Sequence, residues 1–317
     1  MTGEFDLISK YFKPLAGPEG LDLSDDASCV RGSSNHDLIV TKDILVEHVH
    51  FRNEDPADLL AHKALAVNVS DCVAKGAQPN LYWLGLALPA SIDDAWMEGF
   101  SKGLNGAQTL YGCHLAGGDT CITDGPMVIS VTLLGAIPTG KMVTRSGAKC
   151  GDDIYVTGTL GDAALGLWCL EKQTGGMKTL VSAYQKPMPP FKFGIALSSI
   201  SNSSADISDG LIADATHISQ ASNVGMLIHK DDLPLSKQGG QLLRREPDLW
   251  SKVWSGGDDY QIVFTASKGE RVNVLDLAMK TGTQVTIIGE VISEQGVQLL
   301  DKGGQLVQVT HGGYTHF

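Results

Sequence analysis

The stretch "ADISDGLIAD", residues 205–214, concentrates three aspartates among small and apolar residues. The pattern predicts a short strand that ends near Asp206, a turn that contains Asp209, and a helix after Gly210. Carboxylates in such a place repel one another and resist burial unless cations lie between them. We therefore expect metal ions here, beside a helix N-terminus that can receive phosphate. Asp214, one turn into the helix, is interpreted as an ordinary first-turn carboxylate.

Other aspartates occupy similar settings, at predicted strand ends, on helix faces or in glycine-rich turns. They are Asp25, Asp26, Asp43, Asp71 and Asp119. Any one of them alone is typical of a helix cap or a turn. Together they form a set of hard oxygen ligands that suits Mg²⁺ or Mn²⁺ better than zinc, and Mg²⁺ is usually held by a few carboxylates plus substrate phosphates. The pattern indicates cations that attract phosphates which the bare protein would repel.

No familiar phosphate-binding loop accompanies these carboxylates, since neither G-x-x-x-x-G-K-[ST] nor G-x-G-x-x-G occurs. The remaining possibility is a nucleotide held through metals and small glycine turns. Gly117 and Gly118 would let phosphates approach the backbone, and Arg145 could pair with one of them.

Composition limits the alternatives. The chain has 317 residues and a formal net charge of −12, so length favours about two domains, and binding to nucleic acid or an anionic membrane surface is not expected. Its six cysteines are scattered, which favours reduced thiols. The opening "MTGEFDLISK" lacks the pattern of a secretory signal, and no apolar stretch is long enough to span a bilayer, so we expect a cytoplasmic protein.

Strand and helix patterns alternate in both halves, which predicts an α/β or α+β protein. In the first half, we expect strands at 36–51, 81–89 and 127–137, and helices at 56–75, capped by Asp55, and 91–112. Asn68 and Asp71 would share one helix face. In the second half, we expect strands at 153–158, 259–266 and 284–291, a short strand before 206, and helices at 161–173, 192–200 and 211–222. A break at 138–148 divides the chain into domains 1–138 and 139–317.

A series of motifs in order along the chain carries a resemblance. They are "GEFDLISKYF", "DILVEHVHF", "KALAVNVSDCVAKGAQP", "GGDT", "TRSGAKCGDDIYVTGTLGDAALGL", "DISDGLIADATHI", "GGDDYQIVFTA" and "GGYTHF". From residue 3 to 317 the chain resembles the thiamine-monophosphate kinases of the aminoimidazole-ribonucleotide-synthetase-like superfamily. The resemblance implies the two-domain fold of that superfamily, with N-terminal ATP- and metal-binding domains that pair in a homodimer. It also implies direct in-line phosphorylation of thiamine monophosphate to thiamine diphosphate by ATP, with several Mg²⁺ ions.

The resemblance also implies roles for individual residues. The metal ligands would be Asp26, Thr41, Asp43, Asp71, Asp119, Asp206 and Asp209. The ATP contacts would include Gly118, Asp119, Arg145 and Ser208. The substrate contacts would be His50, Asp258 and His311, and the residues central to catalysis Asp71, Asp119 and Asp209. Three positions differ from the family pattern: Lys42 replaces a small hydroxyl residue, Asp258 a glutamate, and His311 an aromatic ring.

Other interpretations remain open. His48 and His50 would alternate along the predicted strand and so face one way, as a zinc pair or as a polar strand face. The chain could be another ATP-using synthetase of the superfamily, such as a selenophosphate, hydrogenase-maturation or purine synthetase. It could also be a non-catalytic metal- and nucleotide-binding protein, for which Lys42 and Asp258 are the only indications. An assay for ADP release with thiamine monophosphate would distinguish these.

Overall fold

The computed structural model describes residues 13, 21–22, 24–32, 35–309 and 312–314. The predictions for His311 and for the opening motif at 3–12 lie outside them. The N-terminal half forms a five-stranded sheet in the order β1-β2-β5-β3-β4, antiparallel except for the parallel pair β3 and β4. Its strands are β1 (Ser28–Arg31), β2 (His36–Val46), β3 (Gln78–Pro89), β4 (His114–Thr123) and β5 (Val128–Pro138).

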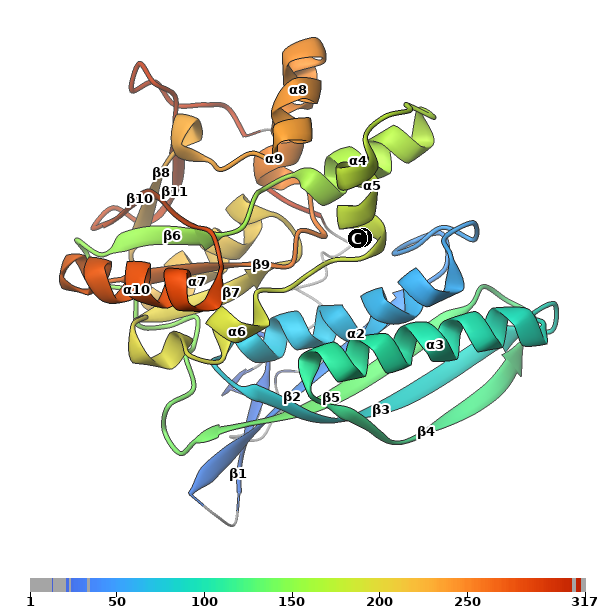
Figure 1. Cartoon of the computed structure of the whole chain (residues 1–317). Helices are drawn as coiled ribbons and strands as arrows, with labels where there is room; N and C mark the ends of the chain where they lie inside the picture. The colour runs from blue at the N-terminus through green and yellow to red at the C-terminus, as the bar shows by residue number, and fades with distance from the viewer. Residues whose placement is uncertain (1–12, 14–20, 23, 33–34, 310–311, 315–317) are drawn as a thin grey trace.

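Two long helices, α2 (Ala57–Ala74) and α3 (Asp94–Tyr111), cover one face of this sheet (Figure 1). The predicted end of α3 is confirmed, because Gly112 caps it in the left-handed conformation with φ +71°. The predicted cap of α2 was wrong: the helix follows Pro56 without a side-chain cap. The carboxylate of Asp55 instead accepts hydrogen bonds from the backbone N–H of Arg52 and from Gln185 Nε2.

The C-terminal half forms a six-stranded sheet in the order β11-β8-β10-β6-β9-β7. Its strands are β6 (Asp153–Thr157), β7 (Ser203–Ile207), β8 (Gly225–His229), β9 (Gln261–Ala266), β10 (Val285–Ile292) and β11 (Gly296–Leu300). Its α-helices are α4 (Asp162–Glu171), α5 (Lys178–Gln185), α6 (Phe191–Gly194), α7 (Leu211–Ser222), α8 (Lys237–Arg245), α9 (Ser251–Ser255) and α10 (Arg271–Thr281). Short 3₁₀ turns are η4 (Leu197–Ser199), η5 (Lys230–Asp232), η6 (Pro247–Trp250) and η7 (Lys268–Glu270).

Side chains of the second sheet alternate between two hydrophobic cores. Tyr155 and Phe264 belong to the core that contains α2, α6 and α10, whereas Ile154 and Val263 belong to the core under α7. Because β6 and β9 are buried on both faces, their central residues are apolar on both sides. The first core joins the two halves, and α2 lies between them (Figure 1).

Two expected elements are shorter than predicted. The strand expected at 36–51 ends at Val46, and residues 48–50 form a turn. The helix expected at 192–200 is the four-residue α6 followed by the turn η4. Within the described residues, every helix is too short or too polar to cross a lipid bilayer.

Candidate functional site

Three carboxylates from distant parts of the chain meet beside α2. Asp26 precedes β1, Asp71 lies in the last turns of α2, and Asp206 is near the end of β7. Each offers an oxygen atom, and these atoms all lie within 4.8 Å of one another. This spacing is short enough for one cation to contact more than one carboxylate. The structure therefore brings together three of the predicted metal ligands.

Asp43 joins this cluster from β2. Thr41 and Asp43 lie two apart on the strand and face α2, where the Thr41 hydroxyl donates at 3.2 Å to the carbonyl and the side-chain oxygen of Asn68. Asp43 shares a hydrogen bond with Asp71. The predicted common face of Asn68 and Asp71 is thus confirmed. Thr41 is buried, and its observed contacts hold β2 against α2.

Burial dominates the electrostatics of the cluster. It raises the pKa of Asp43 to about 6, although the hydrogen bond with Asp71 lowers it. Burial and the charge of Asp26 raise the pKa of Asp206 to about 7. Burial and the charges of Asp206 and Asp43 raise the pKa of Asp71 well above its usual value. These three groups therefore resist ionisation unless a positive charge joins them.

Asp26 differs, because the protein supplies its counter-charges. Lys75 Nζ lies 2.5 Å from Oδ2 of Asp26 and 2.9 Å from Oδ1 of Asp25, and the Arg145 guanidinium pairs with Oδ1 of Asp26. Burial alone would raise the pKa of Asp26, but the charges of Lys75 and Arg145 outweigh it and lower the pKa. Asp26 is therefore held as a carboxylate before any ligand arrives.

The donor set of the cluster fits a hard divalent cation. Among the described residues no lysine or arginine forms an ion pair with Asp43, Asp71 or Asp206. Oδ2 of Asp43 is buried and has no hydrogen-bond partner among the described residues. Buried oxygen atoms without partners are costly in a protein and favourable as ligands of Mg²⁺.

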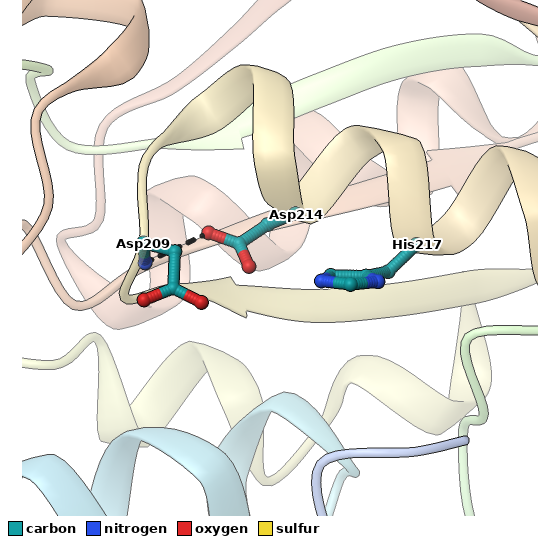
Figure 2. A group of neighbouring side chains, drawn as sticks. All are labelled: Asp209, Asp214 and His217. Carbon is teal, nitrogen blue, oxygen red and sulfur yellow. Dashed lines mark hydrogen bonds between the residues drawn. The ribbon is translucent and has the colours of Figure 1, made fainter. Parts of the chain in front are cut away.

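A second group lies at the turn between β7 and α7 (Figure 2). Asp209, Asp214 and His217 offer ligand atoms within 4.8 Å of one another. The prediction for Asp214 was wrong: its side chain is buried, and Oδ2 accepts the backbone N–H groups of Ser208 (3.1 Å) and Asp209 (3.2 Å). Asp214 therefore shapes the turn that presents Ser208 and Asp209.

A cavity of about 670 Å³ connects this turn with the predicted substrate contacts. Asp43 and Asp209 line it, as do Ser208, His50 and Asp258. The rings of Tyr184, Tyr260 and Tyr314 also line it. The cavity has the size of a small-molecule site, and charged, polar and apolar residues share its wall.

His50 reaches the cavity from a turn. Its Nδ1 accepts a hydrogen bond from the backbone N–H of Val46 at 3.0 Å, and His48 has φ +66°. The strand alternation that suggested a zinc pair is therefore absent, because β2 has already ended.

Asp258 also lines the cavity, and its carboxylate has two partners. Lys63 Nζ is 2.8 Å from Oδ2, and the Tyr260 hydroxyl donates to Oδ1 at 3.1 Å. The backbone N–H of Asp258 donates to Ser208 O at 2.9 Å, which couples this loop to the turn before α7.

Gly118 and Asp119 are not brought to the cluster within one chain. Both lie in the edge strand β4 instead of the expected turn. Asp119 lies in register with Ile44 of β2, but β5 and β3 lie between them, with Ser130 and Gly85 at the intervening positions. At the usual spacing of neighbouring strands, Asp119 is therefore roughly 14 Å from β2. A side chain at Gly118 would lie 2.0 Å from Leu84 O, so packing against β3 already requires this glycine.

Lys42 points to the open face of the sheet, away from α2. Its Nζ donates to Ser130 Oγ at 2.6 Å and to Thr132 Oγ1 at 3.3 Å. Since successive strand residues face opposite sides, Lys42 forms no ion pair with Asp43, but it lines the same cavity and its charge lowers the pKa of Asp43.

Sequence reasoning missed two buried lysines, Lys63 within α2 and Lys75 at its C-cap. Helix α2 is buried on nearly every side. A lysine in an otherwise apolar helix without a polar face is the signal that could have found them, because a buried ammonium requires a partner.

Comparison with known proteins agrees with this geometry. Residues 24–137 match the family description "AIR synthase related protein, N-terminal domain", and residues 149–302 match "AIR synthase related protein, C-terminal domain". The chain is 39% identical to the thiamine-monophosphate kinase of Escherichia coli K12, over 99% of this chain and 98% of that protein. It is 38% identical to the thiamine-monophosphate kinase of Caulobacter vibrioides, over 95% of this chain and 87% of that protein.

Solved structures give the same result. The structure described as AaThiL complexed with AMPPCP and TMP matches with a TM-score of 0.88 and 31% identity, over 99% of this chain and 97% of that one. The thiamine-monophosphate kinase of Stenotrophomonas maltophilia K279a matches with a TM-score of 0.81 and 35% identity, over 96% and 98% of the two chains. Identity and coverage of this order establish that the chain belongs to the thiamine-monophosphate kinase family of AIR-synthase-related proteins.

Proposed function

We propose that this protein transfers the γ-phosphoryl group of ATP to thiamine monophosphate, giving thiamine diphosphate and ADP. The observation that carries the proposal is a cavity of about 670 Å³ lined by the carboxylates of Asp43 and Asp209, with the carboxylates of Asp26, Asp71 and Asp206 grouped beside Asp43. The family relationship supplies the two substrates.

In this reaction a phosphate oxygen of thiamine monophosphate attacks the γ-phosphorus of ATP. The bond from that phosphorus to the β–γ bridging oxygen breaks, and ADP leaves. Direct transfer needs positioning and charge neutralisation more than a protein nucleophile. The described part of the cavity wall is consistent with this, since it offers carboxylates, hydroxyls and lysines.

Several Mg²⁺ ions would neutralise the transferred phosphates when bound. Asp43, Asp71 and Asp206 would hold them, together with the already ionised Asp26 and with Asp209 at the mouth of the cavity. Ser208 and Arg145 are proposed ATP contacts. The N-terminus of α7, whose first turn follows Asp209, would receive phosphate oxygens.

Other lining residues of the same cavity would bind the thiamine portion. They include His50 and Asp258, and Tyr184 and Tyr314 add aromatic surface. His311 stays a prediction.

A homodimer would complete the site. The sheet face opposite α2 and α3 carries exposed apolar side chains, among them Ile44 (51% exposed) and Trp83 (40%). We propose that N-terminal domains, taken as residues 1–138, pack on each other through this face. Asp119 and Gly118 of the partner subunit could then approach a cluster that they do not reach within one chain. Residues 139–317 would form the second domain, and the cytoplasm is the expected compartment.

A coupled assay of ADP release tests the proposal, with ATP and thiamine monophosphate in the presence and absence of Mg²⁺. We expect turnover that requires both thiamine monophosphate and Mg²⁺, and detection of thiamine diphosphate as the product. ATP binding by calorimetry without ADP release would favour a non-catalytic binding protein.

A further inference from the structure

Lys63 is a buried cation that the proposed chemistry does not use. It lies in α2, its side chain is 2% exposed, and it is not among the residues that line the cavity. A buried ammonium persists only with good partners, so its contacts indicate what it does.

Its three partners come from three separate segments. Nζ lies 2.8 Å from Oδ2 of Asp258, donates to the backbone carbonyl of His50 at 3.0 Å, and lies 4.1 Å from the centre of the Tyr184 ring. An ammonium group has three N–H donors, and these contacts use all of them.

Each of those partners forms part of the cavity wall. Asp258, His50 and Tyr184 all line the cavity, from the loop before β9, the turn after β2 and helix α5. One cation beneath the wall thus holds together surfaces from both halves of the chain.

The conformation of Asp258 makes this support more important. Its φ of +72° is unusual for a residue other than glycine, and its side chain remains 29% exposed. The Tyr260 hydroxyl fixes one carboxylate oxygen, and Lys63 fixes the other. Without Lys63 the carboxylate could turn toward solvent, and the His50 carbonyl would lose its donor.

We propose that Lys63 is a positioning residue for thiamine monophosphate. Through its contacts with Asp258, the His50 backbone and Tyr184, Lys63 holds in place the part of the cavity wall that would bind the thiamine portion. Lys63 itself does not contact the substrate. This inference rests on the proposed kinase function. It predicts an effect on thiamine monophosphate binding that is separate from ATP binding, because the carboxylate cluster contacts neither Lys63 nor its partners by any hydrogen bond or ion pair among the described residues.

The test compares Lys63→Met with the wild-type enzyme in steady-state kinetics. We expect the KM for thiamine monophosphate to rise about tenfold or more, while kcat and the KM for ATP change by about twofold or less. Lys268→Met is the matched control: it also removes one lysine ion pair, with Glu290 at 3.4 Å, but on an exposed surface, and should leave both KM values unchanged.

A double-mutant cycle separates positioning from general destabilisation. In the Asp258→Asn background, Lys63→Met should raise the KM for thiamine monophosphate by only about threefold or less, because the partner through which it acts is already altered. The same tenfold effect in both backgrounds, or parallel increases in both KM values, would overturn the proposal.

If Lys63→Met does not fold, Lys63→Gln replaces it, since it removes the charge and shortens the side chain but keeps it polar. An unchanged KM for thiamine monophosphate in folded Lys63→Gln would equally overturn the proposal. Absence of wild-type turnover would overturn the proposed kinase function itself, and is measured first.

Discussion

Asp26 and the neighbouring trio of Asp43, Asp71 and Asp206 differ in how their buried negative charges are compensated. All four carboxylates are buried or nearly so, yet Asp26 has two permanent cations, Lys75 and Arg145. The trio has no such ion pair among the described residues, and each pKa is raised. Asp26 therefore has its counter-charges within the folded protein. The trio has no such counter-charge among the described residues, which fits the proposal that it binds cations.

The largest expected effect is on turnover and concerns the trio. Asp71→Asn keeps the shape and removes a charge, so kcat should fall by about 10³-fold or more, equivalent to about 4 kcal/mol of transition-state stabilisation. The free energy of unfolding in chelator should stay the same or rise, because the substitution relieves repulsion with Asp43 and Asp206. Kinetics and urea titration of the same preparation check both parts. Near-normal turnover would assign Asp71 to structure.

Asp26→Asn should show the opposite balance. It leaves the buried Lys75 and Arg145 short of their main counter-charge, so the free energy of unfolding should fall by about 3–5 kcal/mol. Chemical denaturation in the absence of metal measures this. A loss below about 1 kcal/mol would mean that Asp25 alone satisfies Lys75 and that the contrast between the two regions is weaker than the geometry indicates.

Dependence on pH sharpens the comparison further. The folded pKa values of Asp43 (about 6) and Asp206 (about 7) lie above the usual value of 3.8, so the folded metal-free protein binds more protons than the unfolded chain between these values. The contribution of these two groups to stability should therefore be greatest below about pH 4 and be lost as pH rises to about 7. Added Mg²⁺ should oppose this loss, so the Tm difference with and without Mg²⁺ should grow with pH. A difference independent of pH would contradict metal binding at these carboxylates.

Asp214 should give the smallest effect, now expected to exceed that of an ordinary helix carboxylate. Asp214→Ala removes the acceptor of the N–H groups of Ser208 and Asp209, and should lower the free energy of unfolding by about 1–3 kcal/mol. Asp214→Asn keeps one acceptor oxygen and should lose less. Thermal melts of both variants beside wild type measure the difference, and equal losses would show that the two hydrogen bonds do not stabilise the turn.

Local patterns in the sequence predicted much of this molecule. Helical spacing placed Asn68 and Asp71 on one face of α2, and Gly112 marked the end of α3. Both features depend only on residues close together in the sequence. The pairing of Lys75 with Asp26 cannot be predicted in this way, because it depends on how α2 packs against a segment about fifty residues earlier.

The errors have the same origin. Gly118 was read as part of a phosphate turn, but its role is set by the approach of β4 to Leu84. Asp214 was read from its place in the first turn of a helix, whereas its burial depends on which face of α7 meets the β7 turn. Such features require the tertiary arrangement, and the resemblance to a family could only indicate that the residues belong near a site.

Because α2 is enclosed by both halves of the chain, its backbone amides should report on the whole fold in hydrogen exchange. Residues 60–70 are all buried, so no local opening exposes them without separating the N-terminal sheet from β7 and α6. Their deuterium uptake should be the slowest in the described chain and should track global unfolding. The helix that carries Asp71 would then keep its place through every fluctuation short of complete unfolding, so product release would rely on motions of the cavity's surface loops.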